Sequence, residues 1–244
     1  MLTEIPAEQF AAALDACADQ VLQEAEVAAP PVDAVLLARR LNLEVACDLT
    51  MDVRARFVRL GKAGQGTILV ADDPRPERRQ WAVAHEIGES AAHRVFDHLG
   101  VELSDIPPTG RERVANRLAS CLLLPRAWFA ADGRAVDWDL IALKAVYRTA
   151  SHELIARRML EMSPPVIVTL FDQGRPQWRR SNVLRRPPSL TPPECQTWRR
   201  VSDGGRAAGY DGGDLPEGID DVRCWPVHEP EWQREILRTG LEGW

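Results

Sequence analysis

The chain has 244 residues, long enough for one main domain with a smaller module, and its 45% hydrophobic and 27% charged residues are typical of a globular protein. A net charge of −6 excludes a broadly basic nucleic-acid-binding protein and leaves room only for a local basic strip. No apolar stretch approaches the roughly 18 to 20 residues of a membrane span, the acidic N-terminus is unlike a signal peptide, and the five cysteines form no close pair, so we expect a cytoplasmic protein with reduced cysteines and no membrane partner.

The first hundred residues alternate helical and strand-like segments. Apolar residues at helical spacing predict two helices, the second capped by Asp33, and both lie close to the Pro30-Pro31 break. Strand-like stretches follow, with the turn signal GKAGQG before the last of them, and a long helix comes next. The expected bounds are 7–28 and 33–41 for the two helices, 43–49, 54–60 and 67–72 for the strands, and 77–99 for the long helix.

The middle of the chain is predicted to be helical. One helix spans 111–124 and is stopped by Pro125, and residues 137–162 read as two helices broken around Thr149 to Ser151. Two short helices joined by a short turn are the pattern of a helix-turn-helix. A DNA-binding interpretation competes with packing of the pair on the core, and packing is favoured.

Beyond Pro164-Pro165 the sequence becomes β-type. We expect strands at 166–172, 177–184 and 221–228, a Gly- and Asp-rich loop over 202–218, and a final helix over 230–240. The predicted organisation is therefore a first domain of residues 1–130, a helix-turn-helix-like segment of residues 131–163 and a small β-rich module of residues 164–244.

The segment from Trp81 to His93, WAVAHEIGESAAH, carries the residues with catalytic potential. Residues four apart on a helix differ by about 40° in direction, so His85 and Glu89 share a face and can converge on one ion. Zinc accepts imidazole nitrogen and carboxylate oxygen, and Glu86 can reach a water on that ion and act as its general base. His93 lies about 12 Å along the helix from His85, so it is assigned to orienting Glu89 and not to the ion.

A third ligand must come from another element. In the helix predicted over 111–124, Glu112 and Asn116 share a polar edge beside the apolar stripe. Glu112 is therefore a candidate ligand, and Asn116 is assigned to support it. The competing interpretation, which position alone favours, is that Glu112 is a solvated partner of the helix dipole.

These two segments resemble the ImmA/IrrE-type zinc metallopeptidases, which carry HEIGH or HELGH followed by a segment such as E-x-x-A-N-x-F-A-x-x-L-L-M-P. The resemblance covers about residues 30–165. This chain departs from the pattern at Glu89, where the family has its second histidine. The matching residues are His85, Glu86, Ile87 and Gly88 in the first segment and Glu112, Ala115, Asn116, Ala119, Leu122, Leu123 and Pro125 in the second.

The resemblance implies an α+β, zincin-like fold of the gluzincin type, one zinc ion, and Glu112 as the third protein ligand. It also implies a regulatory endopeptidase whose substrate is a protein, by analogy a helix-turn-helix repressor of the Xre type in stress response or mobile-element control. One histidine with two carboxylates is a harder donor set than the family norm, so Mn or Fe is an alternative to Zn. The alternative function is a catalytically inactive, peptidase-like regulator that acts by protein binding.

A second partner class is suggested by the basic run near Trp178. Arg179, Arg180, Arg185 and Arg186 together with an aromatic ring suit a nucleic acid, because arginines bind phosphates and aromatic rings stack on bases. A solvated strand edge explains the same residues and is favoured.

Overall fold

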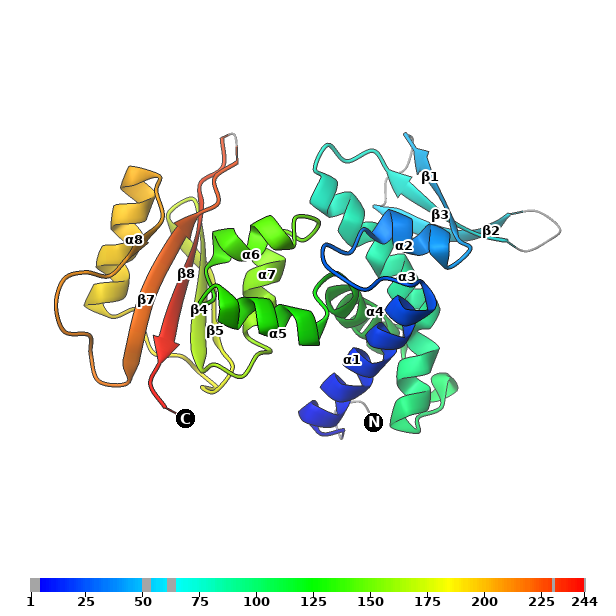
Figure 1. Ribbon diagram of the computed structural model, residues 1–244, viewed down its shortest axis with the longest axis horizontal. Helices are drawn as coiled ribbons and strands as arrows, with labels where there is room; N and C mark the ends of the chain where they lie inside the picture. The colour runs from blue at the N-terminus through cyan, green and yellow to red at the C-terminus, as the bar shows by residue number, and fades with distance from the viewer. Residues whose placement is uncertain (1–4, 50–53, 61–64, 230, 244) are drawn as a thin grey trace. The chain divides into compact units, whose positions relative to one another are not determined.

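The computed structural model describes residues 5–49, 54–60, 65–229 and 231–243. The chain divides into two compact units (Figure 1). The first comprises residues 1–135 and 144–151, and the second residues 136–143 and 152–244. The segment predicted as a helix-turn-helix-like part is thus shared between the two units. Within the described residues, no helix is long and apolar enough to cross a bilayer.

The first unit is mainly helical, with α1, α3 and α4 packed together. α2 begins as predicted, because the Asp33 carboxylate accepts hydrogen bonds from the backbone N–H groups of Val35 and Leu36 at 2.9 and 3.1 Å. The Pro at the first turn of α3 and of α4 suits a helix start, where the missing N–H would be unpaired in any case. The helices are α1 (Ala7–Glu24), α2 (Ala34–Arg40), α3 (Pro76–Leu99), α4 (Pro108–Leu123) and α5 (Arg126–Ala135), with a 3₁₀ turn at Leu103–Asp105.

A small three-stranded sheet covers part of α3. Its order is β1-β3-β2, with β1 (Glu44–Asp48) parallel and β2 (Ala55–Leu60) antiparallel to the central β3 (Gln65–Ala71). Both β2 and β3 contact α3, which buries Ile68 and Val70 of β3. The predicted strands are confirmed, while most of the turn GKAGQG lies outside the described residues. This topology leaves β2 as an edge strand beside the long helix.

The second unit is a five-stranded antiparallel sheet with helices on both faces. Figure 1 shows α8 along one face and α7 near the other. The strand order is β5-β4-β8-β7-β6. The division between the units falls within α6 (Leu140–Val146). The other elements are α7 (His152–Met159), β4 (Val166–Asp172), β5 (Arg175–Ser181), α8 (Pro192–Gly204), β6 (Ala208–Gly209), β7 (Ile219–Pro226) and β8 (Arg234–Leu241).

One expectation for this unit is wrong. The predicted final helix over 230–240 is the strand β8, which pairs with β4 and β7 and is buried over most of its length. Tertiary pairing here outweighs local helical spacing. No element is predicted over residues 185–201, where the structure has most of α8: Thr191 and Glu194 form a capping box, and the two prolines stand in the first turn.

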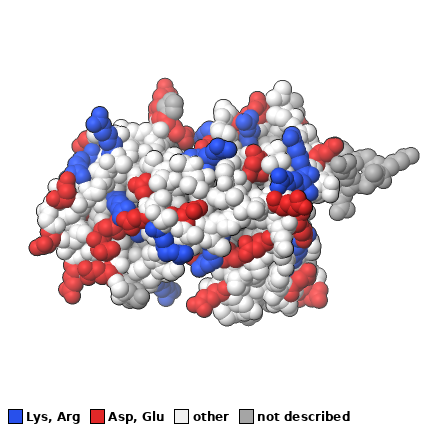
Figure 2. Space-filling model, in the orientation of Figure 1, with Lys and Arg blue, Asp and Glu red and all other residues white. Residues whose placement is uncertain are grey.

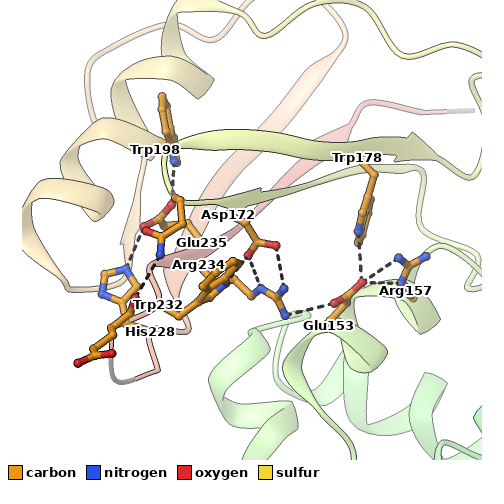
Figure 3. Close-up of polar contacts among 11 residues, drawn as sticks. Glu153, Arg157, Asp172, Trp178, Trp198, His228, Trp232, Arg234 and Glu235 are labelled. Atoms are coloured by element: carbon orange, nitrogen blue, oxygen red, sulfur yellow. Dashed lines mark hydrogen bonds and ion pairs between the residues drawn. The ribbon is translucent and has the colours of Figure 1, made fainter.

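A polar network fixes α7 to the sheet of the second unit. Figure 3 shows Glu153 between two cations: it accepts hydrogen bonds from Arg157 at 2.8 and 3.0 Å and from Arg234 at 3.3 Å. Arg234 also forms a two-pronged ion pair with Asp172 at 2.6 and 2.8 Å. The guanidinium of Arg157 lies 4.6 Å from the centre of the Trp178 ring. The polar side chains of α7 are therefore used to hold the helix in place.

Candidate metal centre

The middle of α3 gathers three potential metal ligands. His85, Glu86 and Glu89 each offer one donor atom, and these atoms all lie within 4.8 Å of one another. The grouping follows from the continuous helix, which places residues one and four apart on adjoining parts of its surface. Glu86 is only 6% exposed, whereas Glu89 is exposed. The cluster thus has a buried and a solvent-facing carboxylate on either side of one imidazole.

Glu112 brings a third carboxylate to the cluster from α4. Its Oε2 lies 3.6 Å from Nε2 of His85. The other oxygen, Oε1, accepts a hydrogen bond from Nδ2 of Asn116 at 2.9 Å, and the same amide donates to the backbone carbonyl of Glu112 at 3.0 Å. Asn116 therefore orients the carboxylate so that one oxygen is held while the other faces the imidazole.

Close contact between α3 and α4 makes this meeting possible. A Cβ added at Gly88 would lie 2.7 Å from the carbonyl oxygen of Ala115 and 3.4 Å from the backbone nitrogen of Ala119. Any larger residue at position 88 would therefore push the helices apart. Gly88 of α3 and the small residues Ala115 and Ala119 of α4 therefore allow the close helix packing that brings Glu112 to His85.

The environment of Glu86 shifts the pKa of its carboxyl group. Burial raises the pKa of this carboxyl above its ordinary value, and the negative charges of Glu89 and Glu112 raise it further. The charge of His85 and a hydrogen bond from the backbone N–H of Phe57 act in the opposite direction. A carboxylate with a raised pKa is a stronger base, which is what proton abstraction from water requires.

A cavity of about 460 Å³ opens beside Glu86 and Glu89. Its other walls are Ala55, Arg56 and Phe57 of β2 together with Ser90 of α3. The β2 residues could not be identified from the sequence, because strand alternation alone does not reveal which strand will be the sheet edge nearest the motif helix. The cavity gives a substrate access to the carboxylates.

His93, which was assigned to orienting Glu89, lies one turn further along α3. Its Nδ1 is 3.0 Å from the backbone carbonyl oxygen of Ser90. Among the contacts of the described residues, none joins the His93 ring to the Glu89 carboxylate. The structure therefore groups His85, Glu86 and Glu89, places Glu112 beside His85 with Asn116 bound to it, and leaves His93 apart from them.

The donor set fits a divalent cation. Two donors about 2.1 Å from a tetrahedral ion stand about 3.4 Å apart, close to the 3.6 Å between His85 and Glu112. The donor atoms of His85, Glu86 and Glu89 lie within 4.8 Å of one another, so Glu89 is a candidate to share an ion with His85. Imidazole nitrogen and carboxylate oxygen are acceptable to zinc and also to harder ions such as Mn and Fe.

Comparisons with known proteins agree with the resemblance seen in the sequence. No curated protein is a significant match to the chain. The fold is similar to that of a solved Mycobacterium tuberculosis transcriptional regulator, with a TM-score of 0.65 and 16% sequence identity over 93% of this chain and 75% of that chain. At this identity the likeness concerns the fold alone. The family model described as the IrrE N-terminal-like domain, a peptidase family, matches residues 38–159. That match spans half of the chain and contains the whole candidate centre, so the chain belongs to the IrrE N-terminal-like domain family.

Proposed function

We propose that the chain is a metal-dependent regulatory endopeptidase that cleaves a peptide bond in a protein substrate in the cytoplasm. The observation that carries the proposal is the placement of Glu86: a buried carboxylate with a raised pKa stands beside a potential metal ligand set and lines an open cavity. Family membership supports the same reading.

In this proposal the residues have separate tasks. His85, Glu89 and Glu112 hold the ion, and Asn116 fixes the orientation of Glu112. When bound, the ion supplies a Lewis acid that lowers the pKa of water and polarises a carbonyl. Glu86 accepts the proton of the attacking water and passes it to the leaving amide nitrogen.

We propose zinc as the resident ion, with Mn and Fe as the alternatives that the two carboxylate ligands favour. Elemental analysis of the protein purified without added metal, followed by competition with a chelator for Zn and Mn, measures the choice directly. Zinc retained against a Mn excess supports zinc, while preferential retention of Mn or Fe contradicts it.

As substrate we propose a helix-turn-helix repressor of the Xre type, whose cleavage would release genes for stress response or mobile-element functions. The resemblance of the sequence to the ImmA/IrrE-type peptidases supports this choice. A nucleic acid is not favoured as partner, because Glu153 and Arg157 of α7 are engaged with the sheet. Figure 2 agrees for the face it shows, where basic and acidic side chains are interspersed without an extended basic patch.

The test is the Glu86→Gln variant with a co-expressed Xre-type repressor. Glutamine keeps the size of the side chain but cannot accept the proton, so we expect the metal content to stay and cleavage to be lost, by at least about a hundredfold. Glu8→Gln, an isosteric change in the exposed first turn of α1, is the matched control and should cleave normally. Equal cleavage by the Glu86→Gln variant and the natural protein would remove the mechanism.

A second candidate function is a catalytically inactive regulator that works by binding a protein partner. It is favoured by one observation, the carboxylate of Glu89 where the family pattern has a neutral imidazole, because an anionic ligand makes a metal less electrophilic. The Glu89→His variant discriminates the two. If this variant cleaves the repressor and the natural protein does not, binding is the function.

A further inference from the structure

The cavity beside the candidate centre has one wall made by a sheet edge. β2 pairs with β3 on one side and is the last strand of its sheet, so within the described residues its other edge has no strand partner. Ala55, Arg56 and Phe57 of this strand line the cavity together with Glu86, Glu89 and Ser90 of α3. A chain entering the cavity therefore meets the strand edge and the carboxylates in the same space.

Among the described residues that line this cavity, Arg56 is the one cation. Its side chain is exposed, and no hydrogen bond or ion pair within 4.0 Å engages it in the described part of the chain. Other arginines of the same unit are paired, such as Arg94 with Glu24 at 2.6 Å and Arg78 with Asp73 at 3.5 Å. Arg56 thus lines a substrate-sized cavity with its guanidinium donors available.

The charges around the cavity determine which substrate side chains it attracts, and Arg56 changes their balance. Glu86, Glu89 and Glu112 are three carboxylates, and the divalent ion proposed above offsets two of their charges. Arg56 supplies the remaining positive charge, although it is not paired with any one of them. Without Arg56 the cavity would attract basic substrate side chains and repel acidic ones. With Arg56 present, the β2 side of the cavity can bind an anion, whereas the carboxylates of α3 repel one.

We propose that Arg56 is a specificity-determining residue that binds a carboxylate of the substrate close to the cleaved bond. Guanidinium and carboxylate form charge-assisted, two-pronged hydrogen bonds, which fix direction as well as charge. The carboxylate belongs to an Asp or Glu side chain or to the C-terminus of the substrate. The proposal rests on the peptidase function above, since it assigns the recognition step of that site.

The experiment measures binding separately from cleavage. The full-length Glu86→Gln protein, loaded with zinc, is titrated with fluorescein-labelled peptides of one fixed sequence whose four central positions are replaced, one at a time, by Asp, Asn or Lys, with blocked ends. We expect the best Asp peptide to bind about tenfold more tightly than its Lys counterpart, the size of one charge-assisted hydrogen bond. Neutral peptides with free or amidated C-termini separate the second source of carboxylate from the first.

Charge reversal at Arg56 is the decisive variant. In the Glu86→Gln background, Arg56→Glu should abolish the preference for Asp and reverse it toward Lys. Arg54→Glu makes the same charge change two residues earlier, outside the cavity lining, and should leave the Asp preference intact. Equal binding of Asp and Lys peptides, a Lys preference in the parent protein, or an identical loss in both charge-reversed variants would overturn the proposal. Selective binding by a protein that cleaves nothing would keep the role of Arg56 and contradict the hydrolase.

Discussion

The contact between Gly88 and α4 gives a sharp test of how the candidate centre is assembled. In Gly88→Ala the new Cβ would start 2.7 Å from the carbonyl oxygen of Ala115, and an ordinary contact begins at about 3.4 Å. The two helices must therefore separate locally by about 0.7 Å, because backbone atoms on both sides leave no flexible side chain to yield. Metal sites tolerate errors of only about 0.2 Å in ligand distance, so this shift displaces Glu112 from the ion.

The expected cost has two parts. Overpacking costs about 1–3 kcal/mol, and alanine in place of glycine returns about 1 kcal/mol of helix propensity, so the metal-free variant should lose up to about 2 kcal/mol. Zinc affinity should fall by about tenfold or more, measured by calorimetric titration beside urea unfolding. Gly204→Ala, at the end of α8 with nothing within 4 Å of the new Cβ, is the control: it should leave zinc affinity unchanged and raise stability by at most about 1 kcal/mol. Wild-type zinc affinity together with unchanged or higher stability in Gly88→Ala would refute the reasoning.

Three further substitutions test other parts of the structure. Asn116→Ala should lower zinc affinity about 10- to 100-fold, because Glu112 loses the donor that orients it; unchanged affinity in a chelator competition would contradict this. Glu194→Ala removes a fully buried carboxylate from its partner Arg179, so the free energy of unfolding measured in urea should fall by about 3–5 kcal/mol. A fall of less than about 1 kcal/mol would contradict this expectation. Hydrogen bonds from Arg234 lower the pKa of Asp172, so its contribution is present above the ordinary value of 3.8 and is lost as pH falls through the lowered pKa. Asp172→Asn should therefore be less stable than the natural protein by about 1 kcal/mol at pH 7 and equally stable in strong acid, and a difference that persists in acid would exclude this cause.

Much of the first unit could be predicted because its elements are local. The spacing of apolar residues gave α3, and Asp33 gave the start of α2, since both depend on interactions within about one helical turn. The second unit was harder because its pairing is non-local. β8 lies between β4 and β7 although its sequence lacks clear alternation, and α8 begins at two prolines that also fit a loop.

The candidate site also has residues that could be predicted from local sequence and residues that depend on the tertiary fold. The grouping of His85 with Glu89 follows from helix geometry alone, and the approach of Glu112 needed a second helix whose motif was readable in the sequence. Arg56 could not be found in advance, because its role depends on which sheet edge faces α3. His93 shows the limit of spacing: four residues from Glu89 it has the right register, yet its ring contacts the backbone of its own helix.

The carboxylate at position 89 acts on metal binding and on hydrolysis in opposite directions. Glu86, Glu89 and Glu112 repel one another around a single imidazole, and this repulsion contributes to the raised pKa of Glu86. A divalent cation relieves the repulsion, so it should stabilise the folded chain, by about 2.7 kcal/mol at a concentration one hundred times its dissociation constant. The same added negative charge makes a bound ion a weaker Lewis acid. Tight metal binding is therefore expected even if peptide hydrolysis is slow, which is why metal content and cleavage have to be measured on the same preparation.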